Sequence, residues 1–184
     1  MRIIGGEFKG RKLFCVQGEK TRPTSDRIRE AIFNILSTQI EASVVLDLFA
    51  GTGALGLEAL SRGAQNAIFI EAHKKALAVL RRNVNALGLE DRATILKWDI
   101  LKNLNCLKAF SACVNLVFMD PPYNRQLIDP ALSNLHFCSC LQAGARVIVE
   151  HSPREAIWGD ELPFQREDQR TYGKTLVSFL RYVL

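Results

Sequence analysis

Apolar and polar positions along this chain follow two different periods, which predict strands and helices in regular succession. Segments with a helical period lie between short apolar runs. One of them places Leu77, Leu80, Val84 and Leu87 on a single face before Gly88. Such an alternation predicts a parallel sheet with helices on both faces. The predicted strands are the short apolar runs VVLDLF (44–49), NAIFIE (66–71), ATILK (93–97), VNLVFM (114–119) and ARVIVE (145–150).

Both ends of the chain depart from this alternation. The first 22 residues alternate apolar and polar positions around Gly5, Gly6 and Gly10, which favours a small β-hairpin or an extended arm. At the other end, a polar strand to about Tyr172, a turn at Gly173 and the apolar run TLVSFLRYVL predict a closing antiparallel hairpin.

Cap residues predict where two of the helices begin. Pro23 stands just before one helix, and Thr24 or Ser25 would cap it. Asp129 followed by Pro130 would start another helix that runs to about Leu141, because proline suits the first helical position. The spacing predicts that the first of these helices buries Ile28, Ala31, Ile32, Ile35 and Leu36.

These elements predict an α/β fold, a doubly wound and mostly parallel seven-stranded sheet that ends in an antiparallel hairpin. A domain of 184 residues buries about 70% of the surface of its unfolded chain, so a single domain over 1–184 is expected. Within it, residues 1–40 would form a basic extension with a helix, and residues 41–184 would form the core. Ligands of such folds bind beyond the carboxyl ends of the strands.

A glycine-rich turn follows the first of these strands in DLFAGTGALG (47–56). Gly51, Gly53 and Gly56 have the spacing of a dinucleotide fingerprint, and Glu71 ends the next strand 20 residues after Gly51. Glycines let the backbone approach a ligand closely, and the acid can accept hydrogen bonds from both ribose hydroxyls. This pattern fits NAD as well as S-adenosylmethionine, and a turn that merely packs a helix on a strand is the structural alternative.

Asp47 favours S-adenosylmethionine over NAD. A carboxylate at this strand end would lie unneutralised beside a pyrophosphate, whereas S-adenosylmethionine carries a cationic amino group and a sulfonium that an acid attracts. Asp99, just beyond residues 93–97, could accept a hydrogen bond from the adenine amino group, or it could be the N-cap of a helix in DILKNL.

The tetrapeptide Asp120-Pro121-Pro122-Tyr123 ends the run VNLVFM and suits chemistry on an amine. The lone pair of a nucleobase exocyclic amine is delocalised, so two acceptors are needed to draw the nitrogen toward tetrahedral geometry. The Asp120 carboxylate and the Pro121 carbonyl oxygen could each accept one N–H, and the prolines would hold that carbonyl still. Tyr123 offers a ring on which a flipped base can stack. A strand terminator with a capping Asp is the alternative.

Composition excludes several classes of protein. The five cysteines are odd in number and lack the spacing of a zinc site, and the three histidines are scattered, so no metal is expected. No apolar run reaches about 18 residues, and the start MRIIGGEFKG lacks the apolar core of a signal peptide. We therefore expect a cytoplasmic protein that neither crosses nor binds a membrane.

The positive charge is concentrated at one end of the chain. Residues 1–30 contain eight of the 24 basic residues and four of the 19 acidic residues, so they carry most of the net charge of +5. A solvated basic end is common, but this concentration favours a polyanionic partner such as a nucleic acid.

Together these motifs resemble a known family over essentially the whole chain. The pattern D-x-F-x-G-x-G at the first strand with [DN]-P-P-[YF] at the fourth is similar to amino-group methyltransferases of class I. The segments RIIGGEFKGRKL, TRPTSDRIREAIFNIL and RTYGKTLVSFL further resemble RsmD-type 16S rRNA guanine-N2 methyltransferases. Some relatives have phenylalanine where Tyr123 stands, which leaves the role of its hydroxyl open.

The resemblance implies roles for particular residues. Asp47, Phe49, Gly51 and Gly53 would line the methionine end of S-adenosylmethionine, Glu71 would bind its ribose and Asp99 its adenine. Asp120, Pro121, Pro122 and Tyr123 would hold the guanine. The partner would be 16S rRNA. Because a chain this small offers little surface for specificity, we expect the rRNA in a small-subunit assembly particle, and we also expect a monomeric enzyme. The rRNA contacts would come from Arg2, Lys9, Arg11, Lys12, Arg22, Thr24, Ser25 and Arg27.

Other functions make different demands on the chain. An adenine-N6 methyltransferase of DNA or RNA shares the tetrapeptide, but the DNA enzymes usually carry a separate recognition region for which 184 residues leave little room. An NAD-dependent oxidoreductase has no use for Asp120-Pro121-Pro122-Tyr123. In a non-catalytic RNA-binding protein Asp120 would be dispensable.

Overall fold

The structure is a computed structural model that describes residues 1–16, 26–155, 157 and 162–184. Its strands are β1 (Val44–Leu48), β2 (Asn66–Glu71), β3 (Ala93–Lys97), β4 (Val114–Met119), β5 (Leu141–His151), β6 (Phe164–Tyr172) and β7 (Thr175–Tyr182). Its helices are α1 (Asp26–Ile35), α2 (Ala54–Ser61), α3 (Lys74–Leu87) and α4 (Ile128–Phe137), with the short 3₁₀ helices η1 (Glu90–Arg92) and η2 (Asn105–Phe110).

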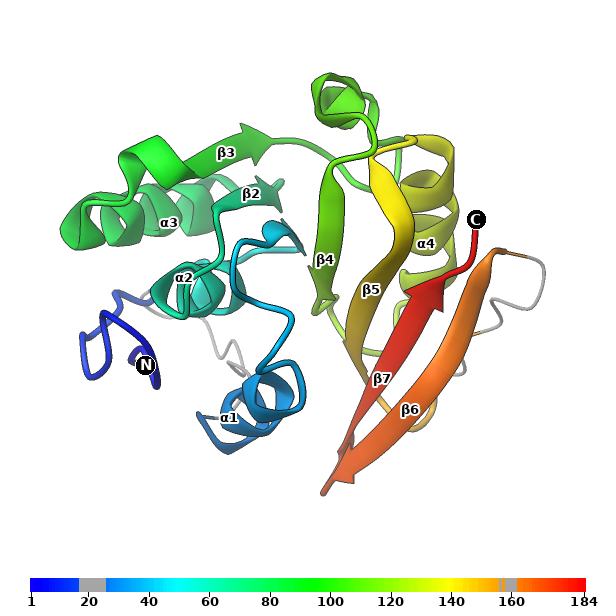
Figure 1. Ribbon diagram of the computed structural model, residues 1–184, viewed down its shortest axis with the longest axis horizontal. Coiled ribbons are helices and arrows are strands. Elements are labelled where there is room, and N and C mark those ends of the chain that lie inside the picture. The colour runs from blue at the N-terminus through cyan, green and yellow to red at the C-terminus, as the bar shows by residue number, and fades with distance from the viewer. Residues whose placement is uncertain (17–25, 156, 158–161) are drawn as a thin grey trace.

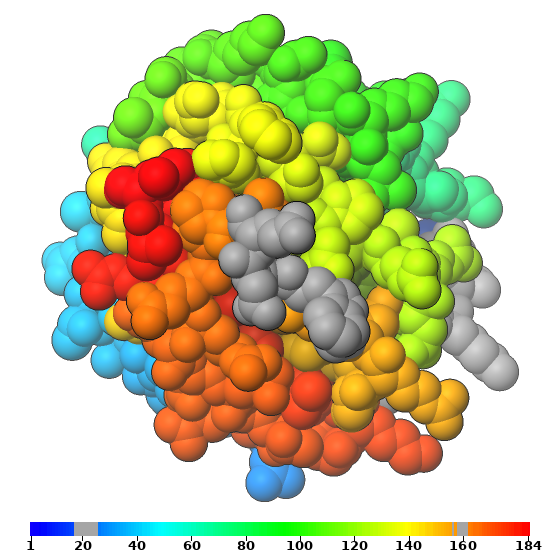
Figure 2. Space-filling model, turned by 90° about the vertical axis from the view of Figure 1, so that its right-hand side faces the viewer, coloured from blue at the N-terminus to red at the C-terminus, as the bar shows by residue number. Residues whose placement is uncertain are grey.

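The strands form one mixed sheet in the order β3-β2-β1-β4-β5-β7-β6, which Figure 1 shows from end to end. Strands β1 to β5 pair in parallel, and β7 lies antiparallel to both β5 and β6. The predicted doubly wound sheet with its closing hairpin is therefore confirmed. Figure 2 looks onto the β6 edge, where exposed polar side chains deter pairing with another sheet.

Two apolar layers cover the two faces of the sheet. On one face the N-terminal residues, α1, α2 and α3 pack on side chains that include Phe69 and Phe118. On the other face α4 and η2 pack on side chains that include Ile68 and Val117. Neighbouring residues of one strand thus enter different layers, as the alternation of a strand requires. Burial on both faces explains why these strands are continuous apolar runs.

The strand order reverses between β1 and β4, and this reversal brings the two sequence motifs together. Leu48 pairs with Met119, so the residues that follow them, Phe49 and Asp120, leave neighbouring strands at the same level. In open α/β sheets ligands bind in the crevice at such a reversal. The glycine-rich turn and the Asp-Pro-Pro-Tyr tetrapeptide therefore share one edge of the sheet.

The predicted inner face of α1 is partly wrong. Ile35 is 37% exposed, and Arg29 and Phe33 are fully buried instead. The helix is turned because Phe33 stacks on Phe118, with ring centroids 5.3 Å apart, while Arg29 donates to the main-chain oxygen of Arg2. The proposed caps Thr24 and Ser25 lie outside the described residues.

The predicted boundary between α4 and β5 is also wrong. The helix begins at Ile128, so Asp129 lies in its first turn rather than at its cap, and it ends at Phe137 instead of Leu141. Ser139 adopts a positive φ of 55°, which stops the helix, and Leu141 pairs with Val114. That pairing draws residues 141–144 into the sheet.

Residues 1–16 form an extended arm, one of the two predicted alternatives, in which Arg2 and Lys12 form an isolated antiparallel bridge. Its Ile3 and Leu13 are buried in the same apolar layer as α1 and α2. No helix in the described part of the chain is both long enough and apolar enough to span a bilayer.

Candidate active site

The glycine-rich turn after β1 is held by two carboxylates. Glu71, at the end of β2, accepts the backbone N–H of Gly51 at 2.8 Å with one oxygen and that of His73 at 2.6 Å with the other. Asp47, near the end of β1, accepts the N–H of Gly56 at 2.9 Å. The structure thus brings together the cofactor residues predicted on β1 and β2 and shows that the acids also shape the turn.

Two glycines of the fingerprint, Gly56 and Gly51, serve different purposes. A side chain at Gly56 would clash with the ring of Phe69 at 2.3 Å, so this glycine lets α2 pack closely on β2. A side chain at Gly51 would meet nothing nearer than the Phe49 oxygen at 3.9 Å. Packing therefore explains Gly56, whereas Gly51 borders open space into which a ligand could come close to the backbone.

Asp47 is buried at 2% exposure, and its surroundings change its acidity. Burial raises the pKa of Asp47 from 3.8 to about 7, an effect that the Gly56 hydrogen bond opposes and the nearby Glu71 carboxylate reinforces. Close to neutral pH this carboxyl group is therefore poised between its two forms, and a cation placed near it would favour ionisation.

Asp99 follows β3 on the same edge of the sheet and is exposed. It accepts the Leu101 N–H at 3.1 Å, so it caps the turn that follows it. Residues 100–102 form a turn rather than the helix that the capping alternative expected, and the proposed adenine contact stays a prediction.

Backbone strain is found in both loops of this edge. Phe49 after β1 has a φ of 60°, and Asn124 and Gln126 after β4 have φ values of 57° and 54°. Such conformations cost about 1–3 kcal/mol each in residues other than glycine and persist only where surrounding contacts enforce them.

The tetrapeptide after β4 is fastened to the sheet by its tyrosine. Pro121 is buried, Asp120 is half-buried and Pro122 is exposed. The Tyr123 hydroxyl donates to Glu150 at 2.6 Å and lies 3.3 Å from the Thr175 hydroxyl. Burial, reinforced by the bond to Glu150, raises the pKa of Tyr123 well above its ordinary value, so the phenol stays neutral. The hydroxyl of Tyr123, whose role the sequence left open, therefore anchors the ring.

A second acid supports the far side of this loop. Glu155 is 8% exposed and accepts the backbone N–H groups of Arg125 at 3.1 Å and Gln126 at 3.3 Å. His151 at the end of β5 contacts the Glu155 main-chain oxygen with Nδ1 at 2.9 Å and the Ser178 hydroxyl with Nε2 at 2.9 Å. Burial lowers the pKa of His151, so its imidazole is neutral.

The basic arm is fastened to α2 by side chains that accept its backbone N–H groups. The buried Glu58 accepts those of Ile4 at 2.7 Å and Gly5 at 2.8 Å, and it also binds Arg62 at 2.7 Å. Ser61 accepts the N–H of Phe8 at 3.0 Å. The arm is therefore an ordered part of the molecule beside α2, as Figure 1 shows.

The predicted RNA-binding residues in the described part of the chain are all exposed, namely Arg2, Lys9, Arg11, Lys12 and Arg27. Arg2 pairs with Asp26 at 3.3 Å, and Arg11 donates to the Ala86 oxygen at 2.9 Å. Arg22, Thr24 and Ser25 lie outside the described residues.

Sequence reasoning missed the residues that hold these loops in place. Glu58 had a visible signal, since it is a lone acid within the apolar helix ALGLEALS. Glu150 and Glu155 gave none, because their partners lie about thirty residues earlier in the chain. The basic side of α3 was also missed. It has exposed Lys74, Lys75, Arg81 and Arg82, with no acid along the helix.

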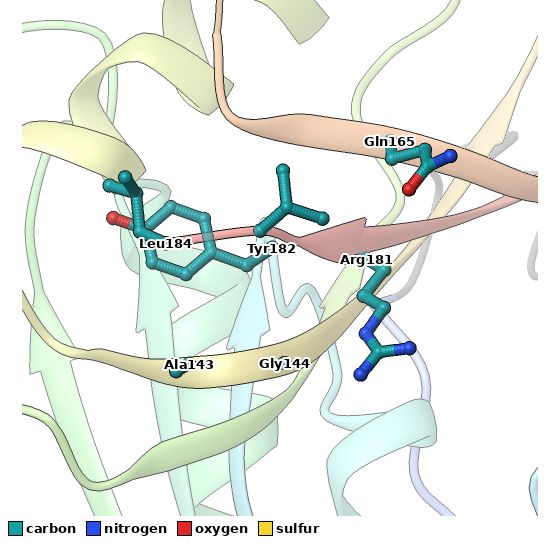
Figure 3. Close-up of a pocket in the computed structure, with 7 residues that line it drawn as sticks. Ala143, Gly144, Gln165, Arg181, Tyr182 and Leu184 are labelled. Atoms are coloured by element: carbon teal, nitrogen blue, oxygen red, sulfur yellow. The ribbon is translucent and has the colours of Figure 1, made fainter.

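A separate hollow lies among the start of β5, β6 and the end of β7 (Figure 3). Its lining includes Gly144, Gln165 and Arg181 and none of the predicted site residues. It is at the opposite end of the parallel strands, so it is not the predicted site. Across the described ranges, no group of three or more His, Cys, Asp or Glu residues is arranged to hold a metal ion.

Comparison with known proteins places the chain in a family. Residues 1–181 match the model of the family described as conserved hypothetical protein 95. The chain is 35% identical to YlbH of Bacillus subtilis over 186 residues, which cover 98% of each chain. It is 37% identical over 153 residues to ribosomal RNA small subunit methyltransferase D of Escherichia coli, covering 82% of this chain and 74% of that one. The solved structure of yhhF from Escherichia coli superimposes with a TM-score of 0.84 at 33% identity, covering 100% of this chain and 98% of the other.

Proposed function

The chain belongs to the conserved hypothetical protein 95 family of RsmD-type methyltransferases, and from this we propose that it methylates 16S ribosomal RNA. The methyl group would pass from S-adenosylmethionine to the exocyclic N2 amine of one guanine. One observation carries the proposal, namely that Phe49 and Asp120 leave neighbouring strands at the same level. The cofactor turn and the pair of amine acceptors would thereby share the crevice in which such folds bind ligands.

The residues of the cofactor turn fit S-adenosylmethionine. Bound there, it would supply a methyl group on a positively charged sulfur. Gly51 leaves room for close approach, and the Glu71 carboxylate stands at the strand end where the fold places a ribose. The buried Asp47 provides negative charge suited to a cation and unsuited to a pyrophosphate. Asp99 would receive the adenine, and Phe49 would line the methionine end.

The tetrapeptide would prepare the amine for transfer. The Asp120 carboxylate and the Pro121 carbonyl oxygen each accept one N–H of the guanine amine, which directs the nitrogen lone pair at the methyl group. Asp120 need not be a strong base, because the amine becomes acidic as it gains the methyl. Positioning of this kind supplies about 7–11 kcal/mol in favourable intramolecular cases. The Tyr123 ring, fixed by Glu150, provides the face for stacking.

The basic arm would bind the phosphates of the RNA. Its exposed Lys9, Arg11 and Lys12 follow the part of the arm whose backbone N–H groups are bound by Glu58 and Ser61. A chain this small offers limited surface for specificity, and we therefore propose that the substrate is a small-subunit assembly particle. The enzyme would act as a monomer in the cytoplasm, where its five free thiols stay reduced.

The test is to map modified nucleosides in 16S rRNA from a strain that lacks the protein. We expect one N2-methylguanosine to disappear and to return when the wild-type protein is restored, but not when the Asp120→Ala variant is restored. An unchanged set of nucleosides would refute the proposal. Loss of N6-methyladenosine instead would transfer the activity to the adenine alternative.

A further inference from the structure

One buried side chain connects the basic arm with the glycine-rich turn. Asn83 lies on α3 and is 1% exposed. Its Oδ1 accepts the backbone N–H of Phe14 at 2.7 Å, and its Nδ2 donates to the Phe14 oxygen at 3.1 Å and to the Thr52 oxygen at 2.9 Å. A single amide therefore bonds the backbones of two segments that are 38 residues apart in the chain.

These bonds use both donors of the amide and pair its oxygen. An asparagine side chain has one oxygen acceptor and two N–H donors, and each has a partner here. If the arm moves away from α3, the buried amide loses two of its three bonds, and a buried unpaired polar group costs about 1–3 kcal/mol. The position of the arm and the bond to Thr52 are thus energetically connected.

The arm end of this connection faces solvent. Phe14 is 38% exposed, and the guanidinium carbon of Arg82 lies 3.5 Å from its ring centroid. Arg11 reaches the Ala86 oxygen from the arm. We define the exposed Arg11 and Phe14 of the arm, together with the exposed Lys75, Arg81 and Arg82 of α3, as the arm–α3 surface, whose basic residues suit phosphates.

The other end of the connection is in the cofactor turn itself. Thr52 stands between Gly51, whose N–H is bound by Glu71, and Gly53, whose N–H donates to the Ala50 oxygen at 2.7 Å. Holding the Thr52 oxygen fixes the peptide that joins it to Gly53. A shift of Asn83 would therefore change the backbone that borders the open space beside Gly51.

We propose that Asn83 is a positioning residue that couples RNA binding on the arm–α3 surface to cofactor binding in the glycine-rich turn. The inference rests on the proposed function, since it requires both ligands. By linkage, if one ligand tightens the binding of the other by some factor, the effect is reciprocal with the same factor. Cofactor that orders the turn would order the arm, and RNA that settles the arm would order the turn.

The experiment measures this factor directly. Affinity for small-subunit particles, purified from cells that lack the protein, is determined with and without saturating S-adenosylhomocysteine. For the wild-type protein we expect the cofactor product to tighten binding by about fivefold or more, within the usual range for coupled sites. A ratio of one in the wild-type protein would overturn the proposal.

The informative variant is Asn83→Asp, with Asn85→Asp as its matched control. A carboxylate at position 83 can still accept the Phe14 N–H but cannot donate to the Phe14 and Thr52 oxygens when it is ionised. Asn85 is exposed on the same helix, so its replacement adds the same charge without touching the connection. We expect the ratio to fall below about twofold in Asn83→Asp and to persist in Asn85→Asp. A purely structural role would lower stability and leave the ratio unchanged, which would also overturn the proposal.

A second measurement needs no variant. Hydrogen exchange of the Phe14 amide, followed by NMR in the wild-type protein, should slow by at least about fivefold when S-adenosylhomocysteine binds, matching the coupling factor. Unchanged exchange would overturn the coupling. If the protein binds no S-adenosylhomocysteine at all, the proposed function fails instead, so the two failures are distinguishable.

Discussion

The loops after β1 and β4 are both held by carboxylates that accept hydrogen bonds, but these carboxylates have different expected roles. After β1, the acids that hold the turn, Asp47 and Glu71, are also the groups expected to meet the cofactor. After β4, the acids that hold the loop, Glu150 and Glu155, lie beneath it. Asp120, the acid proposed to meet the substrate, is a different residue from these two.

This difference indicates in which loop the support of the backbone and the contact with the ligand can be changed separately by mutation. In the cofactor turn, removing an acid takes away a ligand group and also leaves a backbone N–H of the turn unsatisfied. In the tetrapeptide loop, the supporting acids and the acid proposed to position the amine are different residues. Four variants test this contrast, in order of decreasing effect.

The largest effect should come from Asp120→Ala. Without the carboxylate the amine loses one of its two acceptors, so turnover should fall by at least about 100-fold. S-Adenosylmethionine affinity, measured by calorimetry, should stay within about threefold because the cofactor turn keeps both of its acids. Asp91→Ala, an exposed change on η1, is the control. Undiminished turnover would refute the role of Asp120 in positioning the amine.

In the cofactor turn, Glu71→Ala should damage binding and structure together. Hydrogen bonds to a charged group contribute about 1.5–3 kcal/mol, so cofactor affinity should weaken by about 10-fold or more. Thermal denaturation should also occur at a lower temperature, because the Gly51 and His73 N–H groups lose their acceptor. Glu90→Ala, at an exposed position, should change neither quantity. Unaltered calorimetric affinity would remove Glu71 from the ribose site.

Tyr123→Phe tests whether the hydrogen bond that supports the tetrapeptide loop can be removed without changing cofactor binding. The ring remains for stacking, but Glu150 loses the hydroxyl that donates to it at 2.6 Å. We expect kcat/KM for RNA to fall by about fivefold, corresponding to roughly 1 kcal/mol for one hydrogen bond, with no change in cofactor affinity. Tyr172→Phe on β6 serves as the control. An effect confined to cofactor affinity would show that the two loops are not separable.

The smallest expected effect is the release of a proton when the cofactor binds. Because burial raises the pKa of Asp47 to about 7, about half of the free protein holds this proton at neutral pH. A cationic cofactor favours the carboxylate, so binding should release up to about half a proton at pH 7, and affinity should rise from about pH 6 to about pH 8. Calorimetry in buffers of different ionisation enthalpy measures the release.

Asp47→Asn should abolish this linkage while it keeps an acceptor for the Gly56 N–H. The sign for stability is opposite to that for affinity. A carboxyl group whose pKa is raised on folding holds its proton more tightly in the folded state, so stability of the free wild-type protein declines as pH rises from about 4 to about 7. The variant should lose that contribution. A proton release that persists in Asp47→Asn would assign the linkage to another group.

Local patterns in the sequence were sufficient for the order of the elements and for the two motifs. Strand and helix periods depend on neighbouring residues, and the fingerprint with Glu71 depends on spacing within one β-turn-α-β unit. The rule that ligands bind beyond the carboxyl ends of parallel strands also pointed to the edge of the sheet that carries both motifs. The same local reasoning failed at α1, where a buried arginine interrupts the apolar face.

Only the tertiary structure decided which groups hold the site. Tyr123 and Glu150 are 27 residues apart, and Asn83 bonds Phe14 from 69 residues away. No periodicity encodes such pairs, because a hydrogen bond across the fold depends on how two elements pack rather than on either segment alone. The residues proposed to act on ligands were therefore visible as motifs, whereas the residues that hold their loops became visible only once the chain was folded.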